Sequence, residues 1–568
     1  LHTPVKMKNE EPPKLQCRVL TSYEKVFCSA CLTPEIPLTD GMIHAFDGAR
    51  GENIAFQLAF KFPSSSIQMT IRLESELAEH VTLREVAHVP CELPAVATDE
   101  FVLRHAPGLY PDPLIPLSGT LHLAENLWQA VWVGVRIPAD FNPGIYDMKF
   151  HFDMYQKDFP WQQRDFHEEA VVRVHVHPAV LPEQKMICTN WFYADCLSAY
   201  YHEEPWTERF WEILENYFRD LAEHGLNMLM TPLWSVPLDT AIGHERPTCQ
   251  LLGIKYDGGR YGFDFSLLKR WLDLGRKCKV EYFEMSHFFT QWGAKATPKI
   301  MVEENGELKR RFGWDVSSES PEYREFLFAL LPELLDFLRG EGLSGKCYFH
   351  YSDEPFLEMI EEYRHASEPL RKYLGTDEFP VMDALSDVEF YKQGLVSRPV
   401  PCLCKIETFG KETIPHRWCY FAGADKDYPV RSLGAPSCRC RILGVLLYLY
   451  EMEGFLHWGH NFWFTQYSLE CNLDPWRDTT AGRAFCGGHI YNVYPGRDGK
   501  PVDAIHYEVF MEAMQDVRLL QLLESQIGRA KTVDLICEGL SYRPAMNHFP
   551  HEAVWLRDLR NRIFAALE

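Results

Sequence analysis

Short runs of alternating hydrophobic and polar residues dominate the first third of the chain, and Pro, Gly, Asp and Asn separate them. Alternation with a period of two is typical of strands that bury one face, and turn residues at this spacing favour antiparallel pairing. The clearest runs are Asn53–Phe60, Ile67–Leu73, Ala130–Ile137, Ile145–Phe152 and Ala170–Val176. We therefore predict an N-terminal antiparallel β-sandwich domain over residues 1–180.

Near residue 185 the pattern changes to short apolar runs that alternate with longer segments of helical period, which predicts parallel strands joined by crossover helices. The candidate strands are Lys185–Asn190, Asn227–Thr231, Val280–Ser286, Cys347–Ser352, Val381–Leu385, Pro401–Ile406, Trp418–Phe421 and Gly454–Trp458. The candidate helices are Glu208–His224, Phe265–Lys277, Pro321–Arg339, Phe356–Tyr373, Arg439–Met452 and Asp503–Glu524. This multidomain pattern predicts a catalytic (β/α)8 TIM barrel with C-terminal helices over residues 181–568.

Two insertions follow the second and third candidate strands and have the pattern of β-hairpins. Gln250–Phe265 turns at Gly258-Gly259, and Ile300–Arg311 turns at Asn305-Gly306. Because barrel active sites lie at the carboxyl ends of the strands, we expect both hairpins to rise over the site. The residues that end each strand are therefore the candidates for chemistry.

Composition narrows the possible partners. The chain has 568 residues, of which 80 are acidic and 57 basic, so its net charge is −23. The electrostatic field of this negative charge repels polyphosphate and anionic lipid, which argues against nucleic acid or a membrane surface as a partner. No apolar stretch approaches the roughly 20 residues that span a bilayer. Composition leaves the oligomeric state open.

Cysteine usage and the N-terminus bear on location and metal binding. The 17 cysteines form no disulfide framework, which is typical of a reducing compartment, so we expect a cytoplasmic protein. The opening residues, before Met7, resemble a tag remnant, and no signal peptide follows them. Cys28-x-x-Cys31 has half of a zinc-ribbon spacing, and no other cysteine pair completes it. We expect neither a metal nor an organic cofactor.

The fourth candidate strand ends in two adjacent acids, Asp353 and Glu354, followed by Pro355. One reading is a helix start, since an N-cap, a first-turn acid and an early Pro are common there. The other is glycoside chemistry, in which one acid holds a proton and the other stabilises positive charge. Adjacent acids are hard to place on opposite sides of a sugar, so they favour a substrate whose own 2-acetamido group is the nucleophile.

Aromatic and polar side chains gather at the other predicted strand ends, as expected of a cleft in which rings stack on sugar faces and amides fix hydroxyl groups. A single cluster of this kind is equally typical of a packed core under a loop. The candidate substrate-binding residues are Asn190, Trp191, Tyr193, His287, Gln291, Trp292, His350, Trp418, Tyr420, Trp458, Asn461 and Trp463. Their convergence with the acids at one barrel face favours a carbohydrate site.

The chain resembles glycoside hydrolase family 123 over nearly its whole length. The matching stretches are Arg50–Gln57, Pro107–Pro113, Phe289–Gly293, Phe312–Trp314, Phe349–Pro355, Gly454–Phe462 and Val493–Gly496. The resemblance implies a β-sandwich followed by a catalytic barrel, and an exo-acting, retaining β-N-acetylgalactosaminidase with substrate-assisted catalysis. Carried onto this chain, it implies that Glu354 is the acid/base and that Asp353 orients the acetamido group.

The chain departs from the family pattern at Val430-Arg431, Gly488-His489 and Ala504-Ile505-His506. If the usual residues there read sugar hydroxyls, the acid pair is retained while the preferred sugar or linkage differs. We expect the partner to be a glycan or glycoconjugate with a terminal 2-acetamido sugar. The alternatives are a hydrolase of another β-hexosaminide, such as N-acetylglucosamine, and a catalytically silent carbohydrate-binding protein.

Overall fold

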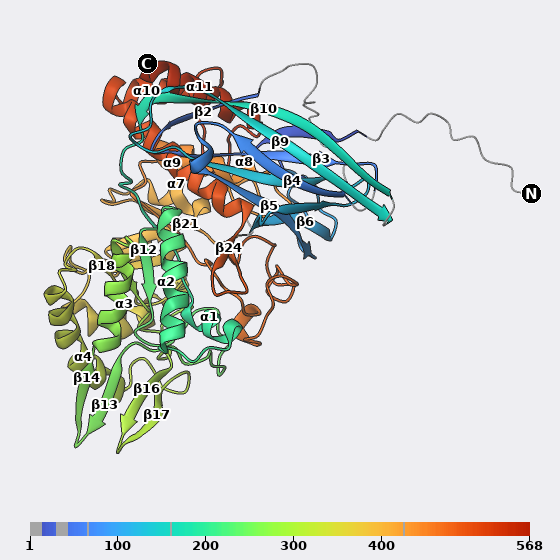
Figure 1. The fold of residues 1–568 in the computed structure, drawn as a ribbon. Coiled ribbons are helices and arrows are strands. Elements are labelled where there is room, and N and C mark those ends of the chain that lie inside the picture. The colour runs from blue at the N-terminus through green and yellow to red at the C-terminus, as the bar shows by residue number, and fades with distance from the viewer. Residues whose placement is uncertain (1–13, 30–43, 65–66, 160–161, 424–425) are drawn as a thin grey trace, which may run out of the picture. The chain divides into compact units, whose positions relative to one another are not determined.

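A computed structural model describes residues 14–29, 44–64, 67–159, 162–423 and 426–568 (Figure 1). The described residues form two compact units. The first contains those up to residue 88 together with 109–182 and 553–568, and the second contains 89–108 and 183–552. Cys31, half of the possible zinc-ribbon spacing, lies outside the described residues.

The first unit is β-rich, as the sequence predicts, and its described residues form two five-stranded sheets, one α-helix and a short 3-10 turn at Ala78–His80. One sheet has the order β1-β3-β8-β5-β6 and the other β2-β10-β9-β4-β7. The strands are β1 (Gln16–Thr21), β2 (His44–Arg50), β3 (Asn53–Lys61), β4 (Ile67–Glu74), β5 (Val81–Cys91), β6 (Gly108–Pro116), β7 (Thr120–Leu123), β8 (Gln129–Arg136), β9 (Gly144–Phe159) and β10 (Gln162–Val180). The helix is α11 (Ala553–Leu567).

The two sheets share one hydrophobic core. Phe56 of β3 meets Phe150 of β9 edge-on with the ring centroids 6.1 Å apart, and Phe60 meets Phe152 at 5.0 Å. All four rings are fully buried. Since they occupy alternate positions along their strands, the period of two in the sequence correctly identifies the buried face.

The second unit contains eight short strands that follow one another as parallel neighbours. They are β11 (Ile187–Asn190), β12 (Met228–Thr231), β15 (Tyr282–Met285), β18 (Cys347–Tyr348), β19 (Met382–Leu385), β20 (Arg398–Pro401), β21 (Trp418–Phe421) and β22 (Gly454–His457). The paired orders are β12-β15-β18, β19-β20 and β11-β22-β21. Single parallel bridges, Phe349 to Val381 and Cys402 to Tyr420, connect these groups.

The sixth predicted strand is wrong in position. The structure forms β20 at Arg398–Pro401, whereas Leu403–Phe409 is helical. Two prolines, Pro399 and Pro401, obscure this strand in the sequence, because proline usually marks a turn. They are tolerated because the alternate amides face β19: Arg398 donates to the carbonyl of Val381 at 2.8 Å, and Cys402 to that of Leu385 at 3.4 Å.

Helices connect most of the strands, and five of the six predicted ones are confirmed with small shifts of their ends. These are α2 (Glu208–Glu223), α3 (Ser266–Lys277), α4 (Pro321–Gly340), α8 (Ser437–Leu449) and α9 (Ile505–Ile527). The predicted helix Phe356–Tyr373 is broken into two 3-10 turns around α5 (Ile360–Ser367). Other short α-helices and strands of this unit are α1 (Ala194–Tyr201), α6 (Glu389–Lys392), α7 (Ile406–Phe409), α10 (Arg529–Cys537), β23 (Val493–Pro495) and β24 (Pro501–Asp503).

Both predicted hairpins are present, and they join each other. The first is β13 (Gly253–Asp257) with β14 (Arg260–Asp264), and the second is β16 (Ile300–Glu304) with β17 (Glu307–Phe312). Parallel pairing of β13 with β16 makes one four-stranded sheet, which projects at the lower left of Figure 1. No helix among the described residues combines the length and hydropathy needed to cross a membrane.

Candidate functional site

The acid pair lies in the loop that follows β18. Glu354 has a φ of 41°, a left-handed conformation that a residue with a side chain rarely adopts. The first 3-10 turn begins only at Leu357, α5 begins at Ile360, and neither has a side-chain cap. The alternative that Asp353 or Glu354 caps a helix is therefore wrong.

One residue of strand β21 and one residue of the loop after β15 form hydrogen bonds with this pair. The hydroxyl of Tyr420, in β21, donates a short hydrogen bond to Glu354. The backbone N–H of Trp292 donates to the carbonyl of Asp353 at 2.8 Å, and Trp292 is itself in a left-handed conformation. Burial and the adjacent Glu354 raise the pKa of the Tyr420 hydroxyl well above its usual range, so this group stays protonated and donates.

The carboxyl group of Asp353 has a strongly perturbed environment. Burial, followed by the charges of Glu354, Asp383 and Asp239, raises its pKa well above the ordinary range, while the nearby His350 acts in the opposite direction. A carboxyl group whose charge is disfavoured in this way retains a proton near neutral pH. A raised pKa of this kind at a carboxyl group next to a second acid is typical of sites that carry out acid–base chemistry.

A buried layer of polar groups lies beneath the pair, centred on Glu284 of β15. His350 places Nε2 2.9 Å from Glu284 Oε2, and Trp191 donates its indole N–H to the same oxygen at 3.1 Å. Thr189 donates a short hydrogen bond to the other oxygen. Asp383 accepts from the amide of Tyr351 at 3.0 Å and lies 3.5 Å from His350 Nδ1. These contacts orient the strand that leads into the acid pair.

His350 bears the compensating positive charge. Burial alone would lower its pKa, but hydrogen bonds with Asp383 and Glu284, together with their charges, raise it to about 9. This raised pKa stabilises the fold fully below about pH 6.5, the ordinary value, and the stabilisation is lost as the pH rises through about 9. A shift of this size corresponds to on the order of 3 kcal/mol.

We therefore expect the free energy of unfolding of wild-type protein to fall between pH 6.5 and pH 9.5 more steeply than that of His350→Gln. Urea unfolding at a series of pH values measures both slopes. The exposed His105 offers a matched control, because His105→Gln should keep the wild-type slope. Equal slopes for wild type and His350→Gln would contradict the assigned ion pair.

Two further predicted residues lie in this buried layer. His287 stacks on His350 with the ring centroids 4.3 Å apart, and burial lowers its pKa well below the usual value, so it is neutral. Neither of its ring nitrogens has a hydrogen-bond partner within the described part of the chain. Asn190 accepts from Asn492 at 3.2 Å and from Arg431 at 3.4 Å. Both predicted residues thus support the site from below.

A second group of residues borders the acid pair from the loops after β12, β15 and β22. The amide of Asp239 donates to the side-chain oxygen of Gln291 at 2.5 Å, and its carboxylate accepts from the amide of Tyr467 at 3.0 Å. The rings of Trp292 and Tyr467 meet edge-on, with their centroids 5.8 Å apart. Burial raises the pKa of Asp239 to about 6, although the Tyr467 amide and Arg246 lower it.

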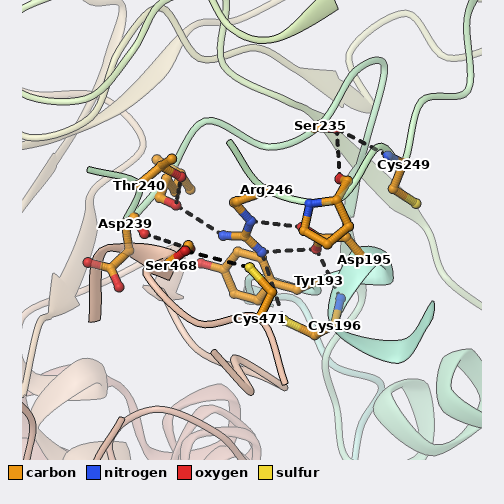
Figure 2. A network of polar contacts seen from close by, with 12 residues as sticks. Tyr193, Asp195, Cys196, Ser235, Asp239, Thr240, Arg246, Cys249, Ser468 and Cys471 are labelled. Carbon is orange, nitrogen blue, oxygen red and sulfur yellow. Dashed lines mark hydrogen bonds and ion pairs between the residues drawn. The ribbon is translucent and has the colours of Figure 1, made fainter. Parts of the chain in front are cut away.

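A buried arginine holds this second group in place (Figure 2). Arg246 forms a two-pronged ion pair with Asp195, with distances of 2.8 and 2.9 Å, and donates to the carbonyl of Leu238 at 3.0 Å. Its guanidinium lies over the ring of Tyr193, 4.7 Å from the centroid. Tyr193 in turn donates its hydroxyl to the carbonyl of Trp458 at 2.7 Å. One cation thereby connects the loops after β11, β12 and β22.

Removal of the Asp195 charge should strongly lower the free energy of unfolding, because both side chains of the ion pair with Arg246 are almost fully buried. Asp195→Asn leaves Arg246 without a counter-ion, which costs roughly 3–5 kcal/mol. We expect the urea unfolding transition to move to clearly lower concentration. Glu212→Gln, which breaks the exposed pair with Arg209, is the matched control and should cost under about 1 kcal/mol. Similar effects of the two variants would contradict this assignment.

The structure does not bring all of the predicted binding residues to the acid pair. Trp418 pairs with Gly454 at the first position of β21, at the opposite end from Phe421. Asn461 uses both side-chain polar atoms on the backbone of Tyr193, at 2.8 and 2.9 Å. Trp463 is 1% exposed and donates to the carbonyl of Val493. These three have core or bracing positions.

Trp458 is partly exposed and remains a candidate for stacking. Its indole N–H donates to the carbonyl of Ala422 at 3.2 Å, and its ring packs against Phe462 and Phe485. Substitution of an exposed stacking ring mainly changes substrate binding, whereas truncation of a core ring mainly changes stability. The partial exposure of Trp458 agrees with the first role.

Several important residues were not among the sequence candidates. Glu284 and Asp383 each lie inside a predicted apolar strand, and an acid within a buried strand was a usable signal, because a buried charge needs a partner. Asp239, Arg246 and Tyr467 lie in irregular loops, where hydrophobic periodicity has no meaning. Only the tertiary arrangement identifies them.

Comparisons with known proteins identify the family of the chain. Residues 191–523 match the family model described as "Glycoside hydrolase 123, catalytic domain". A family 123 glycoside hydrolase from Clostridium perfringens, described in connection with glycolipid glycan hydrolysis, has a TM-score of 0.70 and 14% identity over 97% of each chain. A β-glucuronidase from Bacteroides uniformis has a TM-score of only 0.30 and 11% identity, covering 86% of this chain and 48% of the other. A comparison with curated proteins finds no match.

Proposed function

Because the chain belongs to glycoside hydrolase family 123, we propose that it is a retaining exo-glycosidase that releases terminal β-linked N-acetylgalactosamine. The observation that carries this proposal is the adjacency of Asp353 and Glu354 in one loop, with Tyr420 bonded to Glu354 and with a raised pKa on Asp353. Acids placed on one side of a sugar need a nucleophile from elsewhere, and a 2-acetamido group provides one.

In the proposed reaction, Glu354 donates a proton to the glycosidic oxygen, and the bond from that oxygen to the anomeric carbon breaks. The acetamido oxygen attacks the same carbon and closes an oxazoline ring, while its N–H donates to Asp353. When the substrate binds, its acetamido N–H takes the place of the proton on Asp353, and that proton passes to Glu354 before the glycosidic bond breaks. Water, deprotonated by Glu354, then opens the oxazoline with net retention.

Other residues around the pair have proposed supporting roles. The hydroxyl of Tyr420 fixes the Glu354 carboxyl group toward the leaving oxygen. Gln291, Trp292 and Asp239, which border the pair, and the partly exposed Trp458 are proposed to contact the sugar. Trp191, His287, His350 and Asn190 position the strand ends from beneath. Tyr193 and Asn461 act together in bracing the loops.

We also propose the finer architecture: the two five-stranded sheets of the first unit form a β-sandwich, and the eight parallel strands of the second unit form a (β/α)8 barrel. Support comes from the shared core of the two sheets and from the order of parallel strand neighbours from β12 through β22 to β11. The bacterial relative suggests a glycolipid glycan as the natural substrate class. A cytoplasmic location stays a prediction from the cysteine composition.

A panel of 4-nitrophenyl β-glycosides of N-acetylgalactosamine, N-acetylglucosamine, galactose and glucose tests this function. We expect hydrolysis only of the 2-acetamido sugars, with N-acetylgalactosamine the better substrate. Preference for N-acetylglucosamine would support the other hexosaminidase. Hydrolysis of plain galactoside would contradict substrate assistance, because that sugar has no acetamido group. Sugar binding without turnover would identify a silent carbohydrate-binding protein.

A further inference from the structure

Two histidines and an acid meet on the β-rich unit, on the antiparallel pair of β9 and β10 (Figure 1). Glu169 is the register partner of His151, and His167 that of Asp153. His151 and Asp153 are two positions apart in β9, and His167 and Glu169 two apart in β10, so all four side chains share one face of the sheet. β4 adds Glu74 beside them.

The ligand-type atoms of three of these residues converge. His151 Nδ1 lies 2.9 Å from Glu169 Oε1, and His167 Nε2 lies 3.3 Å from the same oxygen. Such separations suit atoms bound to one ion, since ligands about 2.0–2.1 Å from a tetrahedral Zn²⁺ lie a little over 3 Å apart. The ligand atoms of His151, His167 and Glu169 all lie within 4.8 Å of one another.

His151 adds an independent sign of a ligand. Its side chain is 8% exposed, yet Nδ1 forms no hydrogen bond with any residue in the described ranges, in spite of its short distance to Glu169. A buried ring nitrogen of this kind is costly unless something binds it. Nδ1 of His151 and Nε2 of His167 both face Oε1 of Glu169.

The outer nitrogen of each histidine is occupied by a different carboxylate. His151 Nε2 lies 3.4 Å from Glu74 Oε2, and His167 Nδ1 lies 2.7 Å from Asp153 Oδ1. In the tautomer that donates its N–H to the outer carboxylate, the inner nitrogen of each ring turns its lone pair toward the cluster. Carboxylates that orient histidine ligands in this way are a regular feature of metal sites.

Two other clusters of histidines and acids in the protein differ in the hydrogen bonding of their histidine nitrogens. In the cluster of Asp47, His175 and His177, both nitrogens of His177 bond to carboxylates, at 2.8 Å to Asp47 and 2.9 Å to Glu568. In that of Asp220, His224 and Asp503, the nitrogens of His224 bond to the Asp220 carbonyl and to Glu508. The ring nitrogens of His177 and His224 are thus all hydrogen-bonded, whereas the buried Nδ1 of His151 has no hydrogen bond among the described residues.

We propose that His151, His167 and Glu169 bind a divalent transition-metal ion of the Zn²⁺ type, with Asp153 and Glu74 as the outer carboxylates. A set of two imidazoles and one carboxylate suits Zn²⁺ and leaves a fourth position open to water. His167 and Glu169 are 48% and 40% exposed, so an ion can enter from solvent. The ion would connect β9 to β10 and does not depend on the proposed glycosidase function.

The test uses the full-length protein, treated with EDTA and dialysed. We expect one equivalent of Zn²⁺ by calorimetric titration, one equivalent of Co²⁺ with visible absorption typical of a four- or five-coordinate ion, and a higher melting temperature with Zn²⁺. His167→Ala should abolish all three signals, and Asp153→Asn should weaken Zn²⁺ binding about 10–100-fold. Because His167 is exposed, this variant is expected to fold.

Two variants provide the controls: His177→Gln in the Asp47 cluster, and His105→Ala at an exposed position. Both should keep one equivalent of Zn²⁺. Binding that survives His167→Ala, binding that is lost in His177→Gln, or no stoichiometric binding by wild-type protein would each overturn the proposal. In that case the contacts are ion pairs between protonated histidines and the surrounding carboxylates.

Discussion

Replacement of Glu354 by glutamine is expected to slow the hydrolysis of a glycoside with a poor leaving group by about 10²–10⁴-fold, the usual contribution of a positioned general acid. The loss should be much smaller for a 2,4-dinitrophenyl glycoside, because that aglycone departs without a proton. Steady-state kcat/KM for the two substrates measures the difference. Glu354 qualifies for this role because Tyr420 fixes its carboxyl group.

The same variant should also change the pH profile with the activated substrate. The charge of Glu354 is the largest electrostatic cause, after burial, of the raised pKa of Asp353. Since glutamine removes that charge, the acidic limb of kcat/KM should move to lower pH. Glu358→Gln, at a nearby exposed acid, serves as the control and should leave rates and profile unchanged. Equal losses on both substrates would remove Glu354 from the role of proton donor.

Replacement of Asp353 by asparagine is expected to lower kcat/KM about 10²–10³-fold on every 2-acetamido substrate, whatever the leaving group. Asparagine cannot stabilise the positive charge that develops as the oxazoline forms, and the loss of one such positioned group typically has this size. A thiazoline that mimics the intermediate should bind correspondingly less tightly. Inhibition constants and kcat/KM together measure this effect.

Asp377→Asn is the matched control, because Asp377 is 97% exposed and lies apart from the pair in the fold. It should retain wild-type kinetics. If Asp353→Asn binds the thiazoline as tightly as wild type does, Asp353 has no part in oxazoline formation. If its loss of rate depends on the leaving group as that of Glu354→Gln does, the roles of the two acids must be exchanged.

The acid pair and most of the regular elements could be predicted from the sequence alone. The two hairpin turns, helices such as α2 and α4, and the strand face that buries Phe56 follow from local spacing. Thr207 and Ser320 show why: each accepts a hydrogen bond from a backbone amide of the first helical turn, an interaction within four residues of chain. Local rules suffice where the partners are sequence neighbours.

Only the tertiary structure shows which of the predicted residues lie near the acid pair. Trp418 and Tyr420 are two residues apart in one predicted strand, yet one pairs with Gly454 at the far end and the other bonds to Glu354. Asn461 has the composition of a sugar ligand, but the backbone of Tyr193, distant in sequence, occupies its amide. The sequence pattern states which residue types stand at strand ends, and only the packed chain decides what they contact.

The sequence by itself therefore determined the kinds of element, the acid pair and the resemblance to a family, because each depends on short-range spacing. The tertiary structure alone decided the left-handed turn at Glu354, the charge balance between His350 and its two acids, and the meeting of His151 with His167. These features arise from burial and from contacts between distant segments. Desolvation and Coulomb interactions act through space, so no local pattern in the chain encodes them directly.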